Sequence, residues 1–392
     1  MEDNIKIKFL VLNYTHPEGY PPTFNAINNL SKIVDEVCVL SAFTLQTKWE
    51  YDKNVNLDLI KSEKNRFKLL KAGKFQKLKA YYKYMSKLHR YLKNGSIDII
   101  LIYDNVPLFF FRLVSLLLPF TKLPKVWYHN HDVFPLEFYK KYSVNWFGAH
   151  TELRLVRKVN YLSLPANERK EHFNLKGFKG KYFFIPNYPS QYIHGNINIR
   201  KRIIDNQIRL IYPGNICHKH GFEELIKILC KKVSEKEIHL TLLGDIQEDY
   251  REELIEIVKS INSLDKLHFI SRKSYFEIPD ILQGHHIGWA VNKPLDVTYS
   301  TGGTAANKIY EFIAMGMPVL LYDNDHYKSH LGHLESVFFT DLSEASLMKQ
   351  IQMIIEDYDK YSKSSRSAFV NNFTFESAFN NAAKEVIREI ED

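Results

Sequence analysis

Short apolar runs alternate with segments of helical periodicity along most of the 392-residue chain. The run 97–103, IDIILIY, is apolar at almost every position, as expected of a strand that is buried on both faces of a sheet. Strands that recur with helices between them predict a parallel, doubly wound α/β sheet. The strands expected in the first half are 5–13, 36–41, 97–103, 126–129, 159–164 and 182–186, with a helix at 25–33.

A second series of the same kind begins after a polar stretch at 191–207, which we interpret as a linker between domains. A chain of this length usually forms about two or three domains. We therefore expect two Rossmann-like halves that face a central cleft, with ligands bound at the carboxyl ends of the strands. The strands expected in the second half are 209–212, 239–243, 267–270, 287–291 and 318–322, with a helix at 222–229.

Residues 61–94 concentrate the positive charge of the chain. They hold ten lysines and two arginines against one glutamate, which exceeds the net charge of the whole chain, +8. Apolar residues at helical spacing predict an amphipathic helix here, which either packs on its own domain or docks on an anionic membrane. No zinc finger, RNP-like aromatic motif or Arg-rich recognition segment favours nucleic acid as the partner. The apolar stripe is Leu78, Tyr81, Met85, Leu88 and Leu92, and the cations around it are Lys77, Lys79, Lys83, Lys87, Arg90 and Lys93.

Three cysteines and no CxxC pair favour a reducing, cytosolic compartment. The amino terminus lacks the basic start and long apolar stretch of a secretory signal. The longest apolar region, 106–120, is interrupted by Arg112 and Pro119 and is shorter than the roughly 20 residues that a bilayer span needs. These features predict a cytoplasmic protein, either soluble or peripheral at the inner membrane face.

The segment 300–318, STGGTAANKIYEFIAMGMP, is the strongest candidate for a ligand site. Its glycine-rich start allows the backbone to approach a ligand, and the N-terminus of the helix expected at 305–315 would favour a phosphate. Lys308 and Glu311 are three residues apart on one side of this helix, suited to a phosphate and to sugar hydroxyls respectively. The alternative is an ordinary loop–helix junction with a solvated ion pair. The side expected to be buried is Ala305, Ile309, Phe312 and Ile313.

The stretch 307–322, NKIYEFIAMGMPVLLY, resembles the nucleotide-sugar signature of retaining GT-B glycosyltransferases, especially family 4 (glycosyl transferases group 1). Three further segments resemble the same family in the same order: FFIPNYP, IRLIYPGNICHKHGFEELI and LTLLGD. The resemblance implies a GT-B fold with an acceptor domain at 1–190, a donor domain at 191–375 and a helix at 376–392 that returns to the first domain. It also implies retaining sugar transfer from a nucleoside diphosphate sugar to an acceptor hydroxyl, without metal or other cofactor.

By this resemblance Lys308 is a catalytic candidate that stabilises the leaving diphosphate. Four positions depart from the family pattern: Asn215 replaces an arginine, His220 a lysine, Gly303 the first of two glutamates, and His286 an aspartate. Asp323 and Asp325 form a D-x-D pair, but on the wrong loop for a metal-dependent transferase. The donor-binding candidates are Gly214, Asn215, Lys219, His220, Gly244, Arg272, Gly302, Gly303, Thr304, Ala305, Asn307 and Glu311.

In the first half, the segment WYHNHD places polar groups at the end of an expected strand. By the resemblance, His131 and Asp132 are catalytic candidates, with Asp132 orienting His131 and raising its basicity. His129, His16 and Gly19 are candidates on the acceptor side. H-x-H-D is also a metal-ligand spacing, but no third ligand is identifiable in the sequence.

The acceptor is expected to be a glycan or a lipid-linked molecule, as in surface polysaccharide or glycolipid assembly, because the basic segment lies in the half that holds acceptors in this fold. Three alternatives remain open at this point. The chain could be a different GT-B enzyme, or a catalytically degenerate GT-B fold that acts as a binding or scaffold subunit, given Asn215, His220 and Gly303. The third is a protein that binds nucleic acid through its basic helix.

Overall fold

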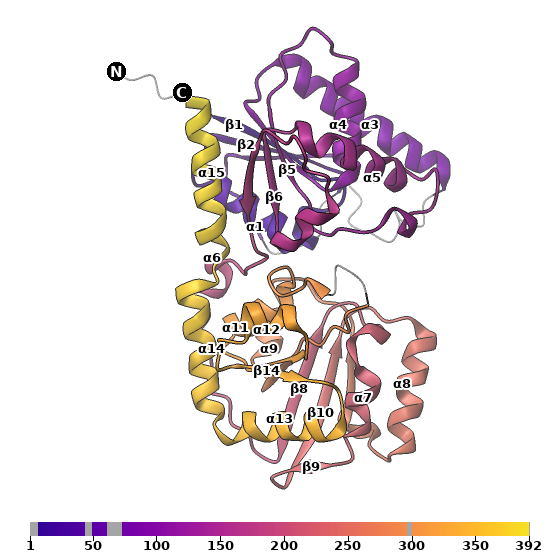
Figure 1. Ribbon diagram of the computed structural model, residues 1–392, viewed down its shortest axis with the longest axis vertical. Coiled ribbons are helices and arrows are strands. Elements are labelled where there is room, and N and C mark those ends of the chain that lie inside the picture. Colours follow the sequence, from indigo (N-terminus) through magenta and orange to yellow (C-terminus); the bar gives the residue numbers. More distant parts are fainter. Residues whose placement is uncertain (1–6, 44–48, 61–72, 296–299, 392) are drawn as a thin grey trace. The chain divides into compact units, whose positions relative to one another are not determined.

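The computed structural model describes residues 7–43, 49–60, 73–295 and 300–391 (Figure 1). The chain forms two compact units. Unit 1 takes the chain up to Pro186 and again from Phe375, and unit 2 is Asn187–Thr374. The boundaries expected from the sequence lie after residues 190 and 375, within a few residues of these.

Unit 1 is built on one parallel sheet with the strand order β3-β2-β1-β4-β5-β6-β7. Leu10 of β1 pairs with Cys38 of β2 on one side and with Ile100 of β4 on the other. β3 is not among the strands expected from the sequence, because it is a partly exposed edge strand whose residues carry a weak apolar signal. The strands are β1 Lys8–Leu12, β2 Glu36–Ser41, β3 Val55–Leu59, β4 Ile99–Tyr103, β5 Lys125–His129, β6 Tyr161–Leu164 and β7 Lys181–Phe184.

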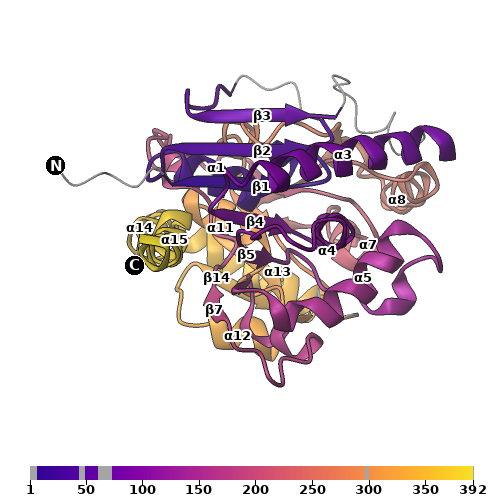
Figure 2. The same ribbon diagram turned by 90° about the horizontal axis from the view of Figure 1, so that it is seen from above.

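Helices cover both faces of this sheet (Figure 2). The core between the sheet and α3 and α4 is made of alternate strand residues, such as Leu10 and Ile100, and of helix residues such as Tyr84 and Phe110. The helices are α1 Pro21–Leu30, α3 Lys74–Asn94, α4 Asn105–Leu116, α5 Val144–Leu155 and α15 Phe375–Glu391, with 3-10 turns η1 Pro17–Gly19, η2 Leu136–Phe138, η3 Val156–Lys158 and η4 Asn167–His172.

The C-terminal helix α15 belongs to unit 1, although it follows unit 2 in the sequence. The ring of Phe379 stacks on Trp127 of β5 at a centroid distance of 5.5 Å. Lys181 of β7 pairs with Glu385 at 2.7 Å. An aromatic stack and an ion pair therefore hold the end of the chain against the first sheet.

Unit 2 contains a second parallel sheet with the order β11-β10-β8-β12-β13-β14, and the short β9 pairs antiparallel with β10. β9 and β14, which are only two and four residues long, are not among the strands expected from the sequence. The strands are β8 Gln207–Pro213, β9 Lys232–Val233, β10 Lys236–Leu243, β11 Leu267–Ile270, β12 Ile287–Trp289, β13 Val319–Tyr322 and β14 Val337–Thr340.

Alternate residues of β8 face opposite layers of helices. Leu210 belongs to the core that contains residues of α7, α8 and α13, whereas Ile211 packs with residues of α9, α11 and α14 (Figure 1). The helices are α6 Gln191–His194, α7 Phe222–Lys227, α8 Glu248–Ser260, α9 Ile278–Leu282, α11 Asn307–Ala314, α12 Asp325–Leu331, α13 Glu344–Glu356 and α14 Tyr358–Asn372, with 3-10 turns η5 His218–His220 and η6 Leu264–Lys266.

The stretch 191–207 is part of unit 2, so its interpretation as a linker between domains is wrong. Arg366 of α14 donates to the backbone carbonyls of His194 and Gly195, at 2.9 and 2.8 Å. Arg202 donates in turn to the carbonyl of Met315 at 3.0 Å. Hydrogen bonds of Arg366 and Arg202 therefore fasten this stretch to the rest of unit 2.

The strand order reverses at one point in each sheet, between β1 and β4 in unit 1 and between β8 and β12 in unit 2. Ligands of open parallel sheets bind outside the carboxyl ends of the strands at such a point. The loops after these strands are therefore where a site is expected. Among the described residues, no helix has the length and apolarity required to cross a bilayer.

Candidate functional site

Two glycine loops meet at the carboxyl edge of the sheet of unit 2. Gly214 follows β8 with a φ of 143°, and Gly244 follows β10 with a φ of 151°, a region that favours glycine. A Cβ atom on Gly244 would lie 1.7 Å from the carbonyl oxygen of Gly214. A Cβ atom on Gly214 would lie 3.3 Å from Nζ of Lys308. Both glycines are therefore required for the loops to pack against each other and against this lysine.

Asn187 fixes the turn that precedes α11. Its backbone amide donates to the carbonyl of Thr304 at 3.0 Å, and its side-chain amide donates to the carbonyl of Ala305 at 2.7 Å. Because both carbonyls are occupied, the turn is held at the entrance of the helix. Asn187 lies within the segment FFIPNYP but is not among the site residues expected from the sequence.

The first turn of α11 offers unpaired backbone donors. Within the described part of the chain, the amides of Asn307 and Lys308 have no backbone acceptor. Unpaired amides and the helix dipole together make a helix N-terminus a site for anions. The side-chain oxygen Oδ1 of Asn307 is buried and also lacks a hydrogen-bond partner. This end of the helix can therefore bind a ligand that carries both negative charge and a hydrogen-bond donor.

The glycine pair of the same turn lies against side chains at the start of α12. A Cβ atom on Gly302 would lie 2.6 Å from the hydroxyl of Tyr327, and one on Gly303 would lie 2.9 Å from Nε2 of His326. Both glycines are buried. They leave room for side chains at the start of α12, and a contact of this pair with a ligand stays a prediction.

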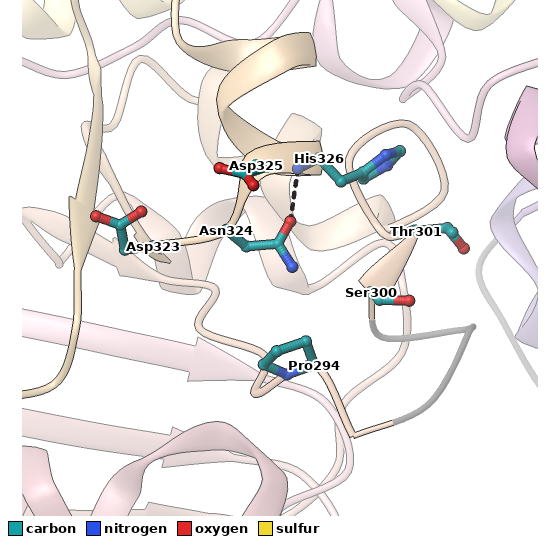
Figure 3. A pocket seen from close by; sticks show the side chains of 7 residues that line it. All are labelled: Pro294, Ser300, Thr301, Asp323, Asn324, Asp325 and His326. Atoms are coloured by element: carbon teal, nitrogen blue, oxygen red, sulfur yellow. Dashed lines mark hydrogen bonds between the residues drawn. The ribbon is translucent and has the colours of Figure 1, made fainter.

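A hollow of about 440 Å³ lies beside this turn (Figure 3). The D-x-D pair borders it, but the segment serves to cap α12: Oδ1 of Asn324 accepts hydrogen bonds from the amides of His326 and Tyr327, at 2.7 and 3.2 Å. Asp323 forms an ion pair with Lys328. Asp323 and Asn324 of this segment thus contact the residues of α12. The residues that line the hollow are Pro294, Ser300, Thr301, Asp323, Asn324, Asp325 and His326.

Lys308 and Glu311 form the charged part of the site. Nζ of Lys308 donates to the hydroxyl of Tyr212 at 2.6 Å. Burial lowers the pKa of Lys308 to about 7, although Glu311 and Cys217 act in the opposite direction. Burial likewise raises the pKa of Glu311 to about 7, against the effect of Lys308. The Glu311 side chain is only 7% exposed and makes no hydrogen bond to a described residue, so its carboxylate can accept from a ligand.

Asn215 and His220, which stand where the family pattern has an arginine and a lysine, supply no positive charge. His220 is buried, and burial, together with the charge of Lys308, lowers its pKa to about 3, so the ring is uncharged at neutral pH. Asn215 is exposed on the loop after β8. Of the other candidates, Arg272 pairs with Asp245 at 3.0 Å at the same edge of the sheet. The carbonyl of Lys219 accepts from the amide of residue 293 at 2.8 Å.

His131 lies at the corresponding edge of unit 1, between two tyrosine rings. Its ring stacks on Tyr103 at 4.9 Å and on Tyr20 at 5.5 Å. Nε2 lies 2.8 Å from the hydroxyl oxygen of Thr23. Burial lowers the pKa of His131 to about 4, despite the opposing charge of Asp132. The ring is therefore uncharged at neutral pH.

The expectation that Asp132 orients His131 is wrong, although the charge of Asp132 does act to raise the pKa of the ring against the larger effect of burial. The Asp132 carboxylate is half exposed and lies 3.4 Å from Nη1 of the buried Arg169, while Thr23 binds the histidine ring. An acid outside the sequence candidates, Asp104, accepts a hydrogen bond from the amide of His131 at 2.9 Å. Asp104 has a φ of 65°, and burial raises its pKa to about 6 against the effect of that hydrogen bond. Its position directly after a strand is the signal that could have identified it.

The remaining acceptor-side candidates are packed inside unit 1. Nδ1 of His129 lies 2.9 Å from the hydroxyl oxygen of Ser163. The ring of His16 covers Gly19, where a Cβ atom would lie 1.6 Å from Cε1 of that ring, so Gly19 makes room for His16 and not for a donor. The rings of His129 and His131 are 5.0 Å apart, but no described residue completes a metal site with them.

Comparison with known proteins bears on both units. Residues 196–371, most of unit 2, match the sequence model of the family Glycosyl transferases group 1. None of the curated protein sequences gives a match. A glycosyltransferase from Rickettsia africae superposes with a TM-score of 0.69 at 14% identity, over 99% of each chain. HepE from Anabaena, solved with UDP and glucose, superposes with a TM-score of 0.65 at 13% identity, over 97% of this chain and 100% of HepE.

This chain has the GT-B fold. A third GT-B structure, WaaG, a glycosyltransferase involved in lipopolysaccharide biosynthesis, superposes with a TM-score of 0.61 at 11% identity. It covers 96% of this chain and 98% of WaaG. The prediction of two Rossmann-like doubly wound domains is confirmed. The main path of the second sheet has the strand order 3-2-1-4-5-6 within its own unit, and the first sheet has the same order with β7 as a seventh strand.

Proposed function

We propose that this chain is a glycosyltransferase that moves a sugar from a nucleoside diphosphate sugar to an acceptor hydroxyl. The observation that carries the proposal is the start of α11, where unpaired amides, Lys308 and the buried Glu311 adjoin the glycine loop of β8 at the point of strand reversal. The match of residues 196–371 to glycosyl transferases group 1 supports it. So does the GT-B structure of HepE, which contains UDP and glucose.

The chemistry follows from charge. The bond between the anomeric carbon and the β-phosphate oxygen breaks, and negative charge builds up on the departing nucleoside diphosphate. The amides of α11 and the Lys308 ammonium are preorganised to stabilise that charge. The acceptor oxygen bonds to the anomeric carbon on the same face, its proton passes to a phosphate oxygen, and the configuration is retained. Glu311 accepts hydrogen bonds from the ribose hydroxyls.

Two finer parts of the proposal have direct tests. We infer that transfer of a hexose proceeds without a metal, because α11 and Lys308 supply the positive charge, so activity should persist in excess EDTA. The anomeric configuration of the product, read by NMR, should match that of the donor. Loss of activity with EDTA would contradict the first statement, and an inverted product the second.

Nucleotide binding tests the proposal itself. We expect saturable binding of UDP or GDP, and we expect Glu311→Gln to weaken it about tenfold or more, since hydrogen bonds to a charged group contribute about 1.5–3 kcal/mol. Glu256→Gln on the exposed face of α8 is the matched control and should bind as the wild type does. If the wild type bound neither nucleotide, the degenerate binding or scaffold subunit would be favoured instead.

We further propose that unit 1 works at an anionic membrane, through α3. The helix buries one row of side chains, whereas three apolar side chains on the opposite side are exposed: Phe75 by 88%, Leu78 by 59% and Tyr82 by 70%. The expected stripe is thus wrong at Leu78. Lysines flank the exposed row, which suits a surface of anionic lipid. The buried row is Ala80, Tyr84, Leu88 and Leu92, and residues 61–72 of the basic segment lie outside the described residues.

The direction in which α3 runs places its exposed apolar row at the same edge of the sheet as the candidate residues of unit 1. The helix lies between β3 and β4, which are parallel members of one sheet, so it must run back from the carboxyl edge to the amino edge. In Figure 2, α3 extends beyond the arrowheads of β2 and β3. Its exposed apolar row is in the first turns, at the edge where β5 delivers His131. A lipid-linked glycan at the cytoplasmic face of a membrane is therefore the acceptor that we propose.

Liposome flotation tests the membrane proposal. The wild type should float with anionic vesicles and not with neutral ones, and the triple variant Phe75→Ser/Leu78→Ser/Tyr82→Ser should remain in the bottom fraction. The matched control changes two exposed apolar residues of unit 2, Ile203→Ser and Leu264→Ser, and should float. Equal recovery of the wild type with both vesicle types would contradict the proposal.

A further inference from the structure

Lys308 is the cation in the first turn of α11, and its amine contacts Tyr212. Three elements contribute: Lys308 from α11, Tyr212 from β8 and His220 from η5. We propose that Tyr212, anchored by His220, is the positioning residue that directs the Lys308 amine toward the leaving diphosphate. This inference rests on the proposed function.

The directions of the hydrogen bonds follow from the chemistry of the groups. Nδ1 of His220 lies 3.1 Å from the carbonyl of Val291, which can only accept, so Nδ1 carries the proton. Nε2 of the uncharged ring is then an acceptor, 2.7 Å from the hydroxyl of Tyr212. The same hydroxyl lies 2.9 Å from the carbonyl of Asn215. The Tyr212 hydroxyl therefore donates to one of these two acceptors, and its oxygen accepts from Lys308.

This arrangement leaves N–H donors of the Lys308 amine available to a ligand. An ammonium group has three N–H donors, and Tyr212 accepts from one of them at 2.6 Å. The amine also lies 3.9 Å from the centroid of the Tyr212 ring, a cation–π contact. The other N–H donors of Lys308 have no acceptor among the described residues. They can be directed at phosphate oxygens.

The uncharged His220 is part of the same arrangement. A lysine at position 220 would place a second cation against Tyr212 and Lys308 and could not accept the tyrosine proton. The departure from the family pattern at His220 thus fits a site in which one partly buried lysine is fixed by a tyrosine. The groups that act on the charge of Lys308 are Glu311 on its own helix, Tyr212 and Cys217 on β8 and its loop, and His220 on η5.

The Tyr212→Phe variant removes the hydroxyl and keeps the ring. Because the hydroxyl oxygen stabilises the ammonium form, its loss should lower the pKa of Lys308. The rate of acetylation of Lys308 as a function of pH, followed by mass spectrometry, should have its inflection near pH 7 in the wild type and about one unit lower in the variant. UDP affinity at pH 7 should fall about tenfold, with a larger loss in kcat than in the affinity for the donor.

Controls separate positioning from packing. Tyr358→Phe removes another buried hydroxyl of unit 2, which donates to the carbonyl of His286 at 2.9 Å, and should leave the Lys308 inflection unchanged. His220→Leu should move the inflection in the same direction as Tyr212→Phe, and His220→Gln, whose amide can both donate and accept, should restore part of it.

The acetylation profile requires no nucleotide, so its outcome is separate from that of the proposed function. An inflection that is the same in the wild type and in Tyr212→Phe would overturn the positioning role, whether or not UDP binds. A shifted inflection in a chain that binds neither UDP nor GDP would support the role of Tyr212 in holding Lys308 and would contradict the transferase.

Discussion

At the scale of single residues, the site of unit 2 depends on positions that tolerate no side chain. Gly214 and Gly244 bring two loops so close that a Cβ atom on one would meet the backbone of the other. Asn187 then holds the turn before α11 through two hydrogen bonds. The site that we propose for a diphosphate is therefore built on rigid backbone, which lowers the cost of organising it on binding.

Gly244→Ala tests this closeness. The added Cβ atom would meet the Gly214 carbonyl oxygen at 1.7 Å, so we expect a loss of roughly 1–3 kcal/mol in the free energy of unfolding of unit 2 and a loss of nucleotide affinity. Gly284→Ala is the control, since its nearest atom would be 3.6 Å away, and it should change stability by less than about 0.5 kcal/mol. Chemical denaturation measures both. Similar values for the two variants would show that the loops are not tightly packed.

At the scale of elements, the sequence interpretation fails where a helix carries apolar residues on both its buried and its exposed face. In α3 the buried row begins at Ala80, opposite Phe75 and Tyr82, so an apolar stripe drawn through Leu78 mixes the two faces. The helix α15 shows the converse case, in which a helical pattern at the end of the chain packs on β5 and β7 of the first unit.

Phe379→Ala tests the attachment of α15. The ring is buried against Trp127, and truncation of such a side chain costs roughly 3–5 kcal/mol. We expect the unfolding transition of unit 1 to move to lower denaturant by a corresponding amount. Val370→Ala, on the exposed side of α14, should have an effect below about 0.5 kcal/mol. A Phe379→Ala variant as stable as that control would show that α15 adds little to unit 1.

At the scale of the whole molecule, buried uncharged histidines make stability depend on pH. Burial lowers the pKa of His131, His194, His285 and His286 to about 4, whereas the unfolded chain titrates near 6.5. The unfolded state therefore binds more protons between these values, and stability that is complete above pH 6.5 is lost as the pH falls toward 4.

We expect the melting temperature to decrease steadily from pH 7 to pH 4.5. His194→Gln should flatten this dependence, because one such histidine contributes at most about 3 kcal/mol at acidic pH. His333→Gln, at an exposed position, should leave the slope unchanged. A melting temperature that is constant over this range would contradict the expectation that these rings are buried and uncharged.

The sequence by itself determined the two α/β series, most of their strands and the helix that carries Lys308 and Glu311. These features are local: a buried strand needs consecutive apolar residues, and a helix needs its own periodicity and end signals. The edge strand β3 is only partly buried and β9 has two residues, so neither leaves such a pattern, whereas β14 is buried but only four residues long.

Only the tertiary structure decided which groups the site residues contact. Tyr212, His220 and Lys308 are brought together from three elements. Asp132 pairs with Arg169, and side chains at the start of α12 occupy the space beside the glycine pair. Partners of this kind are separated by many residues in the chain, and their distances depend on how whole layers pack. The charge and tautomer of each buried group follow from that packing, because burial and hydrogen bonding set its pKa.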